Sequence, residues 1–411
     1  MKRSLFSILM LSVVTLCHSQ QNKLLAFEHH DKTVYGMLQT PAGNGPFPLI
    51  IIVPGSGPHD RDGTVKFDHP NYSCLYPGLY GQTLRPYKQL AEALVDSGYA
   101  VLRYNKIEFT YGANLGTITF DKLWLPFKSA IDYAKTRAEV DTNSIILLGH
   151  SEGSVLIPFV ASARNDIKAL ISVAGARTPF DSIYARQIID ITQQCGGDIV
   201  QTQAQANAIL NYFSDVRAGN YTSATPDMFG VKAAVWAEYF AATDSLTTHY
   251  NKAALPSLFL GMGDDFNVPP SELLRLKSEI TISNDFWSLP GLTHFMTTAD
   301  DPQVSRVVPD TIVYWLRKKG MMTTGLPEGG REPAKIRVFP NPASETIHVQ
   351  LPFVTGTAVL EVRNSLGLLV YSAIHRGQSI LDLVTSDLPA GVYSLTVTDK
   401  KGNYTVRFLK R

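Results

Sequence analysis

Apolar positions along most of the chain follow two patterns that alternate with each other. Short continuous apolar runs are typical of strands buried on both faces, and they occupy residues 48–53, 100–102, 145–148, 168–173 and 258–262. Apolar residues three or four apart predict amphipathic helices, and they occupy residues 87–97, 120–137 and the stretch after residue 152. Strands alternating with helices predict a mainly parallel sheet covered by helices on both faces, an α/β fold.

The pattern changes twice further along the chain. Between residues 180 and 254 the alternation stops, and three helices are predicted at 184–191, 202–213 and 231–239. Residues 321–335 are rich in Gly, Pro and charge without any periodicity, which predicts a linker. From 336 to 411, short alternating runs broken by Gly, Pro and Asn predict a small antiparallel β-sandwich.

Composition and charge narrow the class of protein. A chain of 411 residues with 45% hydrophobic residues suits two or three packed domains. The formal net charge is +1, and no dense run of Lys and Arg occurs, so we expect no nucleic-acid partner.

The first 19 residues have the features of a secretory signal peptide. Lys2 and Arg3 precede an apolar segment over 5–16, and Cys17-His18-Ser19 forms a cleavage site before Gln20. The apolar segment is shorter than the roughly 20 residues that a membrane span needs. A lipoprotein signal through Cys17 fits less well, because Leu16 is large for the position before a lipidated cysteine. We expect no transmembrane segment in the mature chain.

Two cysteines, Cys74 and Cys195, would remain after cleavage of the signal. In an oxidising compartment they could pair, and two separate buried thiols are an equal alternative. Their spacing is not that of a clustered zinc site, so we expect neither a metal nor a cofactor.

The strand that ends at Leu148 leads into Gly149-His150-Ser151-Glu152-Gly153, and a helix follows. A strand that turns sharply into a helix holds the middle serine at a strained, exposed position, and the flanking glycines allow the close approach of strand and helix. Ser151 is therefore the candidate nucleophile.

Backbone N–H groups that could stabilise an oxyanion are expected beside this serine. Ser56 and Gly57 follow the first buried strand, so their loop lies at the edge of the sheet where Ser151 would lie. We expect the N–H of Ser56 or Gly57, together with that of Glu152, to form the oxyanion hole.

The remaining partners follow later strands. Asp264 and Asp265 both come just after the strand 258–262, and the spacing to Val268-Pro269 favours Asp265 as the acid. A strand over 281–289 leads to the loop histidine His294, the candidate base. The order Ser, Asp, His along the chain is the order that α/β-hydrolases use.

With these motifs, residues 20–320 resemble the α/β-hydrolase superfamily, in particular its dienelactone-hydrolase and prolyl-oligopeptidase-like esterases. The resemblance implies that residues of about 180–254 form a helical cap over the sheet. Aromatic residues of the cap fit either an acyl pocket or the cap's own core: Tyr212, Phe213, Trp236, Tyr239 and Phe240. One departure is Asn105, where such esterases usually carry an aspartate.

Residues 336–411 resemble the type A C-terminal sorting domain of the type IX secretion system of Bacteroidetes. The matching segments are 338–343, 364–367, 388–393 and the terminal Lys410-Arg411. The resemblance implies passage through the periplasm to the outer cell surface or the medium, with the type IX machinery as partner. An accessory β-domain that binds carbohydrate or protein is the alternative.

These features predict a secreted serine hydrolase that cleaves small carboxylic esters through an acyl-enzyme on Ser151. A prolyl-oligopeptidase-like peptidase or a thioesterase would use the same three residues. A surface protein that uses this fold only for binding is an alternative from another class.

Overall fold

The computed structural model describes residues 20–282, 284–322, 336–350, 358–375, 380–399 and 402–411. The expected signal peptide over 1–19 and almost all of the expected linker lie outside these residues.

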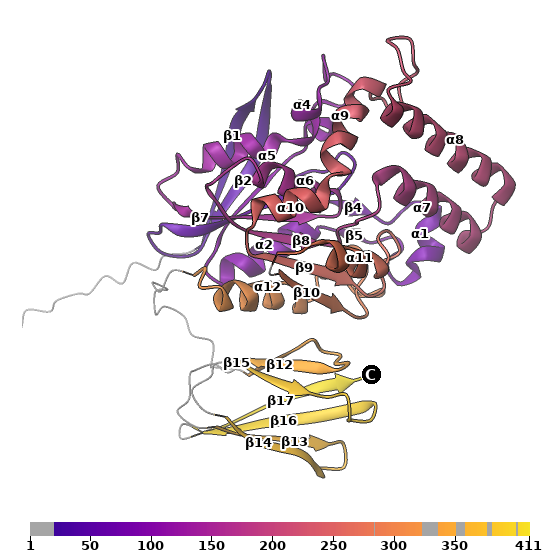
Figure 1. Ribbon diagram of the computed structural model, residues 1–411. Helices are drawn as coiled ribbons and strands as arrows, with labels where there is room; N and C mark the ends of the chain where they lie inside the picture. The colour runs from indigo at the N-terminus through magenta and orange to yellow at the C-terminus, as the bar shows by residue number, and fades with distance from the viewer. Residues whose placement is uncertain (1–19, 283, 323–335, 351–357, 376–379, 400–401) are drawn as a thin grey trace, which may run out of the picture.

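An eight-stranded sheet forms the centre of the first part of the chain, in the order β1-β2-β6-β3-β7-β8-β9-β10 (Figure 1). Its strands are β1 (Gln21–His29), β2 (Lys32–Thr40), β3 (Phe47–Val53), β6 (Ala100–Tyr104), β7 (Val140–His150), β8 (Ile167–Val173), β9 (Ser257–Met262) and β10 (Asn284–Leu289). The pairs β1–β2 and β2–β6 are antiparallel, and all the other pairs are parallel. The α/β fold expected from the apolar pattern is confirmed.

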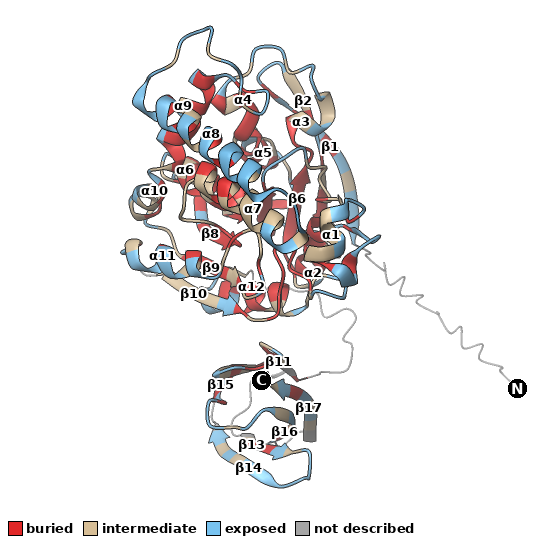
Figure 2. Cartoon of the chain, turned by 90° about the vertical axis from the view of Figure 1, so that its right-hand side faces the viewer, coloured by how far each residue is buried: buried red, intermediate tan, exposed pale blue. Residues whose placement is uncertain are grey.

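Each inner strand buries both faces, which is why its sequence is a continuous apolar run. In β3, Leu49 and Ile51 belong to one hydrophobic core, whereas Ile50 and Ile52 belong to the other. The first core includes residues of α5 (Pro126–Ala134) and α6 (Glu152–Ala161), and the second includes residues of α2 (Pro86–Asp96) and α12 (Val307–Lys318). Figure 2 shows inner strands such as β6 and β8 coloured mainly as buried.

Four helices occupy the segment that the sequence led us to expect as the cap: α7 (Phe180–Cys195), α8 (Ile199–Ala218), α9 (Ala233–Thr243) and α10 (Leu246–Ala253). The sequence pattern predicted the first three and missed α10, whose short length gives little periodic signal. The helices α7 and α8 lie side by side and extend beyond the sheet in Figure 1.

Other elements differ from the prediction as well. The single helix expected over 120–137 is divided into α4 (Phe120–Trp124) and α5, because Pro126 has no N–H for the preceding turn and begins a new helix instead. The strand β1 was not predicted; it pairs with β2 along its whole length as a hairpin at the sheet edge.

A disulfide joins Cys74, in α1 (Pro70–Leu75), to Cys195 at the end of α7, with the Cα atoms 5.6 Å apart. The cap is thus covalently tied to the loop region that follows β3. Within the described residues, we find no helix that combines the length and the apolar character needed to cross a membrane.

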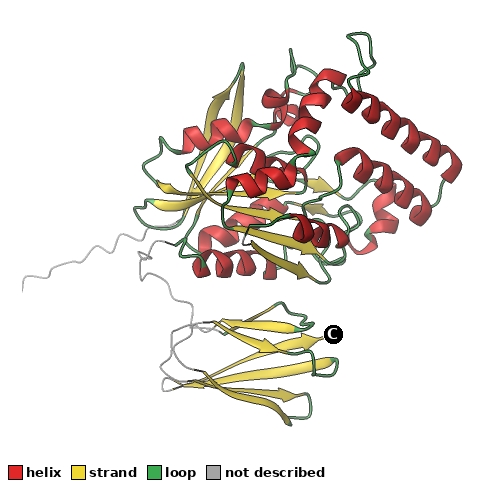
Figure 3. Cartoon of the chain, viewed as in Figure 1, coloured by secondary structure: helices red, strands yellow, loops and turns green. Residues whose placement is uncertain are grey.

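The C-terminal part consists of strands without helices in its described residues, as Figure 3 shows. One sheet contains β11 (Arg337–Phe339), β12 (Thr346–Gln350) and β15 (Ile380–Val384); the other contains β14 (Leu369–His375), β13 (Ala358–Asn364), β16 (Gly391–Asp399) and β17 (Gly402–Lys410). All pairs in both sheets are antiparallel. Alternate residues of the two sheets, such as Ile347, Val349, Leu360 and Val362, form a separate hydrophobic core, which confirms the expected all-β domain.

Candidate active site

Ser151 occupies the turn between β7 and α6. Its φ of 52° and ψ of −119° lie outside the regions that L-residues prefer, so the backbone there is strained. The strain is held by close packing: a Cβ on Gly149 would lie 2.4 Å from the Gly153 carbonyl, and a Cβ on Gly153 would lie 2.2 Å from the Val53 oxygen. Both positions therefore require glycine.

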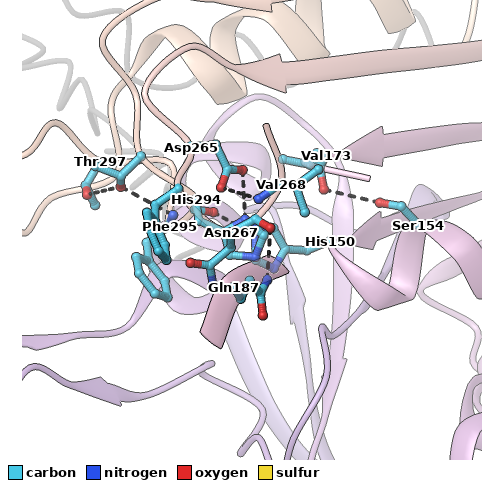
Figure 4. Close-up of polar contacts among 12 residues, drawn as sticks. His150, Ser154, Val173, Gln187, Asp265, Asn267, Val268, His294, Phe295 and Thr297 are labelled. Carbon is cyan, nitrogen blue, oxygen red and sulfur yellow. Dashed lines mark hydrogen bonds and ion pairs between the residues drawn. The ribbon is translucent and has the colours of Figure 1, made fainter. Parts of the chain in front are cut away.

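His294 and Asp265 form a direct buried contact (Figure 4). The imidazole Nδ1 lies 2.8 Å from Asp265 Oδ2, and the N–H of Val268 donates to Asp265 Oδ1 at 2.8 Å. Asp264 is exposed, and its backbone N–H donates to the Leu292 carbonyl. Of the two aspartates left open by the sequence, the one against the histidine is Asp265.

His150 connects the serine turn to the histidine loop. Its Nε2 lies 2.8 Å from the His294 carbonyl oxygen, and the two imidazole rings are 4.8 Å apart. Because a carbonyl oxygen only accepts, Nε2 carries the proton and Nδ1 accepts from the Tyr87 hydroxyl at 3.0 Å. Tyr87 in turn accepts from the Gly55 N–H at 3.0 Å. This chain of buried hydrogen bonds fixes the glycine loop, the serine turn and the His294 loop relative to one another.

Burial lowers the pKa of His150 far below its ordinary value, and the neighbouring His294 adds to this effect. His150 therefore stays neutral and keeps the tautomer that the hydrogen bonds require.

The predicted oxyanion residues gather around one cavity. Ser56, Gly57 and Glu152 line it together with Ser151. Glu152 is the first residue of α6, where backbone N–H groups have no partner within the helix. Lys106 stabilises the loop that contains Ser56 and Gly57, because its Nζ donates to the Gly55 carbonyl at 3.1 Å.

Lys106 and Glu152 form a buried ion pair under the serine turn, at 3.2 Å. Glu108 also approaches Lys106 Nζ at 3.3 Å, while Trp124 Nε1 and the Tyr239 hydroxyl donate to the second oxygen of Glu152 at 3.1 and 3.3 Å. Burial acts to lower the pKa of Lys106, but the two carboxylates outweigh it and the pKa is raised. The amine is therefore charged over the physiological range.

Sequence reasoning missed the hydrogen bonds of Tyr87, Lys106 and Tyr239, because their partners lie far away in the chain. It did note Asn105 as a departure. That residue is buried, and its Oδ1 accepts from the Arg61 N–H at 2.9 Å. Asn105 thus shapes the loop after Gly57, and its neighbour Lys106 lines the cavity.

A group that could hold a metal occurs among the described residues: His29, His30 and Asp121, whose ligand atoms lie within 4.8 Å of one another. Both ring nitrogens of His29 already bond to Ser129 Oγ and the Asp121 carbonyl, and the Asp121 carboxylate pairs with Lys128. These partners fit a structural cluster, and we assign no metal to it.

The sheet order, the strained serine between a strand and a helix, and the aspartate–histidine pair on later loops define an α/β-hydrolase. Residues 74–299, more than half of the chain, match the family described as "Serine aminopeptidase, S33", and the chain belongs to this family. Residues 337–411 match the family described as "Secretion system C-terminal sorting domain". Both resemblances drawn from the sequence are confirmed.

Esterase EstD of Thermotoga maritima is 30% identical over 167 residues, which make up 40% of this chain and 36% of that protein. The chain thus spans about a third of the length of this curated relative. Similar solved structures include Est1E from Butyrivibrio proteoclasticus, 18% identical with a TM-score of 0.45 over 72% of this chain and 98% of that one. The acylaminoacyl peptidase of Pyrococcus horikoshii is 12% identical with a TM-score of 0.47 over 76% of this chain and 43% of that one.

Proposed function

We propose that this chain is a serine hydrolase that cleaves carboxylic esters through an acyl-enzyme on Ser151. The observation that carries the proposal is the buried contact of 2.8 Å between His294 and Asp265, in a loop that His150 ties to the serine turn. With its Nδ1 proton donated to Asp265, the imidazole has Nε2 free to accept a proton from a hydroxyl.

In the proposed reaction, Ser151 Oγ attacks the ester carbonyl while His294 takes its proton. Asp265 holds the orientation of the imidazole and stabilises its charged form. The N–H groups of Ser56 or Gly57 and of Glu152 stabilise the oxyanion, each by about 3–4 kcal/mol. His294 then protonates the leaving alcohol, and water activated by the same residue releases the acid.

The test compares hydrolysis of p-nitrophenyl acetate by the wild-type protein and by Ser151→Ala. We expect turnover by the wild type and a loss of at least about 1000-fold in kcat for the variant. Aminoacyl anilides and acyl thioesters, run in parallel, separate esterase from peptidase and thioesterase. A folded wild-type protein that turns over none of these substrates would support the binding-protein alternative instead.

We propose further that residues 1–19 are a signal peptide, that 321–335 is a linker, and that 336–411 directs export by a type IX secretion system. Support comes from the family match of residues 337–411 and from the separate core of that domain. In a host with this system, a chain that ends at residue 322 should stay in the periplasm, while the full chain reaches the surface or the medium. Equal export of both would refute this part.

A further inference from the structure

A cavity of about 800 Å³ opens beside Ser151, beneath the cap. This volume is within the range of roughly 300–1,000 Å³ that encloses most of a drug-sized molecule. Six aromatic side chains from α4, α7, α9 and the segment before α9 contribute to its wall: Trp124, Phe180, Tyr184, Phe229, Trp236 and Tyr239. An acetyl group would leave most of this space unfilled.

The aromatic wall is held in place by contacts among its own rings. The Phe180 and Trp236 rings stack with centroids 5.4 Å apart, and Trp124 lies 4.7 Å from Tyr239. Three of these rings have polar atoms that are already bonded to protein: Trp236 Nε1 donates to the Met228 carbonyl, and Trp124 and Tyr239 donate to Glu152. The rings therefore present mainly apolar surface to an occupant.

The charged groups at the cavity wall each have an ion-pair partner in the protein. Lys106 bridges Glu152 and Glu108, and Arg177 pairs with Glu279. Burial is the main cause that raises the pKa of Glu108, and the charge of Lys106 opposes this shift. The second oxygen of Glu108 is buried without a protein partner, so it too is closed off from the cavity.

Neutral polar side chains at the wall are also bonded to protein. Gln187 Nε2 donates to the Asn267 carbonyl, Thr178 Oγ1 donates to Glu272, and Thr243 Oγ1 donates to the Tyr239 carbonyl. Because most polar side chains at the wall are already bonded to protein, a charged group that entered would lose its water and find few partners, at a cost in free energy.

We infer that the cavity receives a bulky, uncharged and largely apolar group joined to the scissile ester. This inference rests on the proposed function and narrows its substrate class. It also sets the chain apart from an enzyme that selects a free amino terminus, because the carboxylates Glu152 and Glu108 already share Lys106.

The test uses two series of esters on the full-length protein. In one, p-nitrophenyl esters carry acetyl, hexanoyl, 5-carboxypentanoyl or 6-aminohexanoyl groups; in the other, acetate esters carry the same variation on the alcohol. Each buried methylene is worth about four-fold in binding. In at least one of the two series, we expect the neutral six-carbon group to give the highest kcat/KM. Its kcat/KM should be at least about ten-fold higher than the value for acetyl and than the value for either charged group. Charged groups that match the neutral group in both series would overturn the inference.

A charge placed at the rim should change this selectivity. Phe229 is 48% exposed, and its φ of 52° suits Asp and Asn. The quantity to compare is the rate for the ammonium substrate divided by the rate for the neutral six-carbon substrate. In Phe229→Asp this ratio should be about ten-fold higher than in Phe229→Asn, because Asn has the same shape as Asp without the charge. Phe109, also 48% exposed but not part of the cavity wall, provides the control Phe109→Asp, which should leave the ratio unchanged.

The two proposals fail in different ways. If the wild type hydrolyses p-nitrophenyl acetate but does not distinguish charged from neutral groups, the cavity inference is wrong and the esterase proposal stands. If the folded wild type hydrolyses no ester, both are wrong.

Discussion

At the scale of single residues, the site depends on which groups the fold brings into contact. Ser151, Asp265 and His294 could be proposed from the sequence, because each follows a strand that ends at the same edge of a parallel sheet. Between the two adjacent aspartates, the spacing to Val268-Pro269 favoured Asp265, but the sequence could not show which carboxylate meets the histidine, because adjacent residues point in different directions. The folded chain brings Asp265 to the histidine and leaves Asp264 exposed.

Asp265→Asn should lower kcat/KM for p-nitrophenyl acetate by about 1,000- to 10,000-fold, because the imidazole loses the partner that fixes its tautomer. Asp264→Asn, the matched control, should stay within about three-fold of wild type. Steady-state kinetics of the two purified variants check this. A larger loss in Asp264→Asn than in Asp265→Asn would reverse the assignment.

Lys106→Met should both destabilise the protein and slow the reaction. It leaves Glu152 buried without its cation and frees the Gly55 carbonyl that Lys106 holds. Breaking one side of a buried ion pair costs about 3–5 kcal/mol of unfolding free energy. Denaturant unfolding measures this cost, and kcat should fall more than KM rises, because the oxyanion loop moves.

Two comparisons keep the Lys106 result interpretable. Lys106→Met with Glu152→Gln should recover part of the stability, since Glu152 then no longer carries a buried charge without its cation. Lys277→Met, on the exposed side of α11 (Ser271–Glu279), should change neither the unfolding free energy nor kcat. If Lys106→Met has the same unfolding free energy as the wild type, the Lys106–Glu152 pair does not have a structural role.

At the scale of elements, the apolar pattern predicted the buried strands and most helices, since periodicity records which faces are buried. It missed the division at Pro126, the hairpin strand β1 and the short helix α10. The apolar pattern also could not predict the hydrogen-bond chain from Gly55 through Tyr87 and His150 to His294. Its members come from separate elements, and no local pattern records which distant side chains meet.

The disulfide between Cys74 and Cys195 should stabilise the body and cap together. It closes a loop with a sequence separation of 121 residues, and a cross-link of that length removes about 5 kcal/mol of chain entropy from the unfolded state. Thermal unfolding with and without dithiothreitol tests this, with a lower Tm expected for the reduced wild type. The Cys74→Ser, Cys195→Ser double variant should show no response to reductant. A reduced wild type, with free thiols verified, that keeps its Tm would contradict the expectation.

At the scale of the whole molecule, the chain contains two parts with separate cores. The catalytic candidates and the cavity belong to the first part, while the C-terminal sheets have a core of their own. Contacts of His348 with Trp287 and Tyr314 join the two parts. This division supports a hydrolase that carries a separate sorting domain.

The stability of the molecule should depend on pH through His59 and His150, whose pKa values are lowered in the folded chain. Burial, with the nearby Lys106, lowers the pKa of His59 to about 4, and burial holds the pKa of His150 well below normal. In the unfolded chain both titrate near 6.5, so between pH 4 and 6.5 the unfolded state binds more protons. The unfolding free energy should therefore rise with pH across this window and change little from these groups above it.

His59 alone should account for about 3 kcal/mol of this change, at about 1.4 kcal/mol per pH unit. Urea unfolding of the wild type and His59→Gln at several pH values between 4 and 8 measures it. In the variant, the unfolding free energy should rise less steeply with pH between pH 4 and 6.5. Equal slopes would mean that His59 does not titrate differently in the two states.

The central claim is that Ser151 is an activated nucleophile, and covalent labelling tests it most directly. The full-length protein, treated with a fluorophosphonate and digested, should carry a single adduct on the peptide that contains Ser151. The adduct should be absent from Ser151→Ala and strongly reduced in His294→Ala. A folded wild-type protein that carries no adduct, or carries it on another residue, would contradict the account.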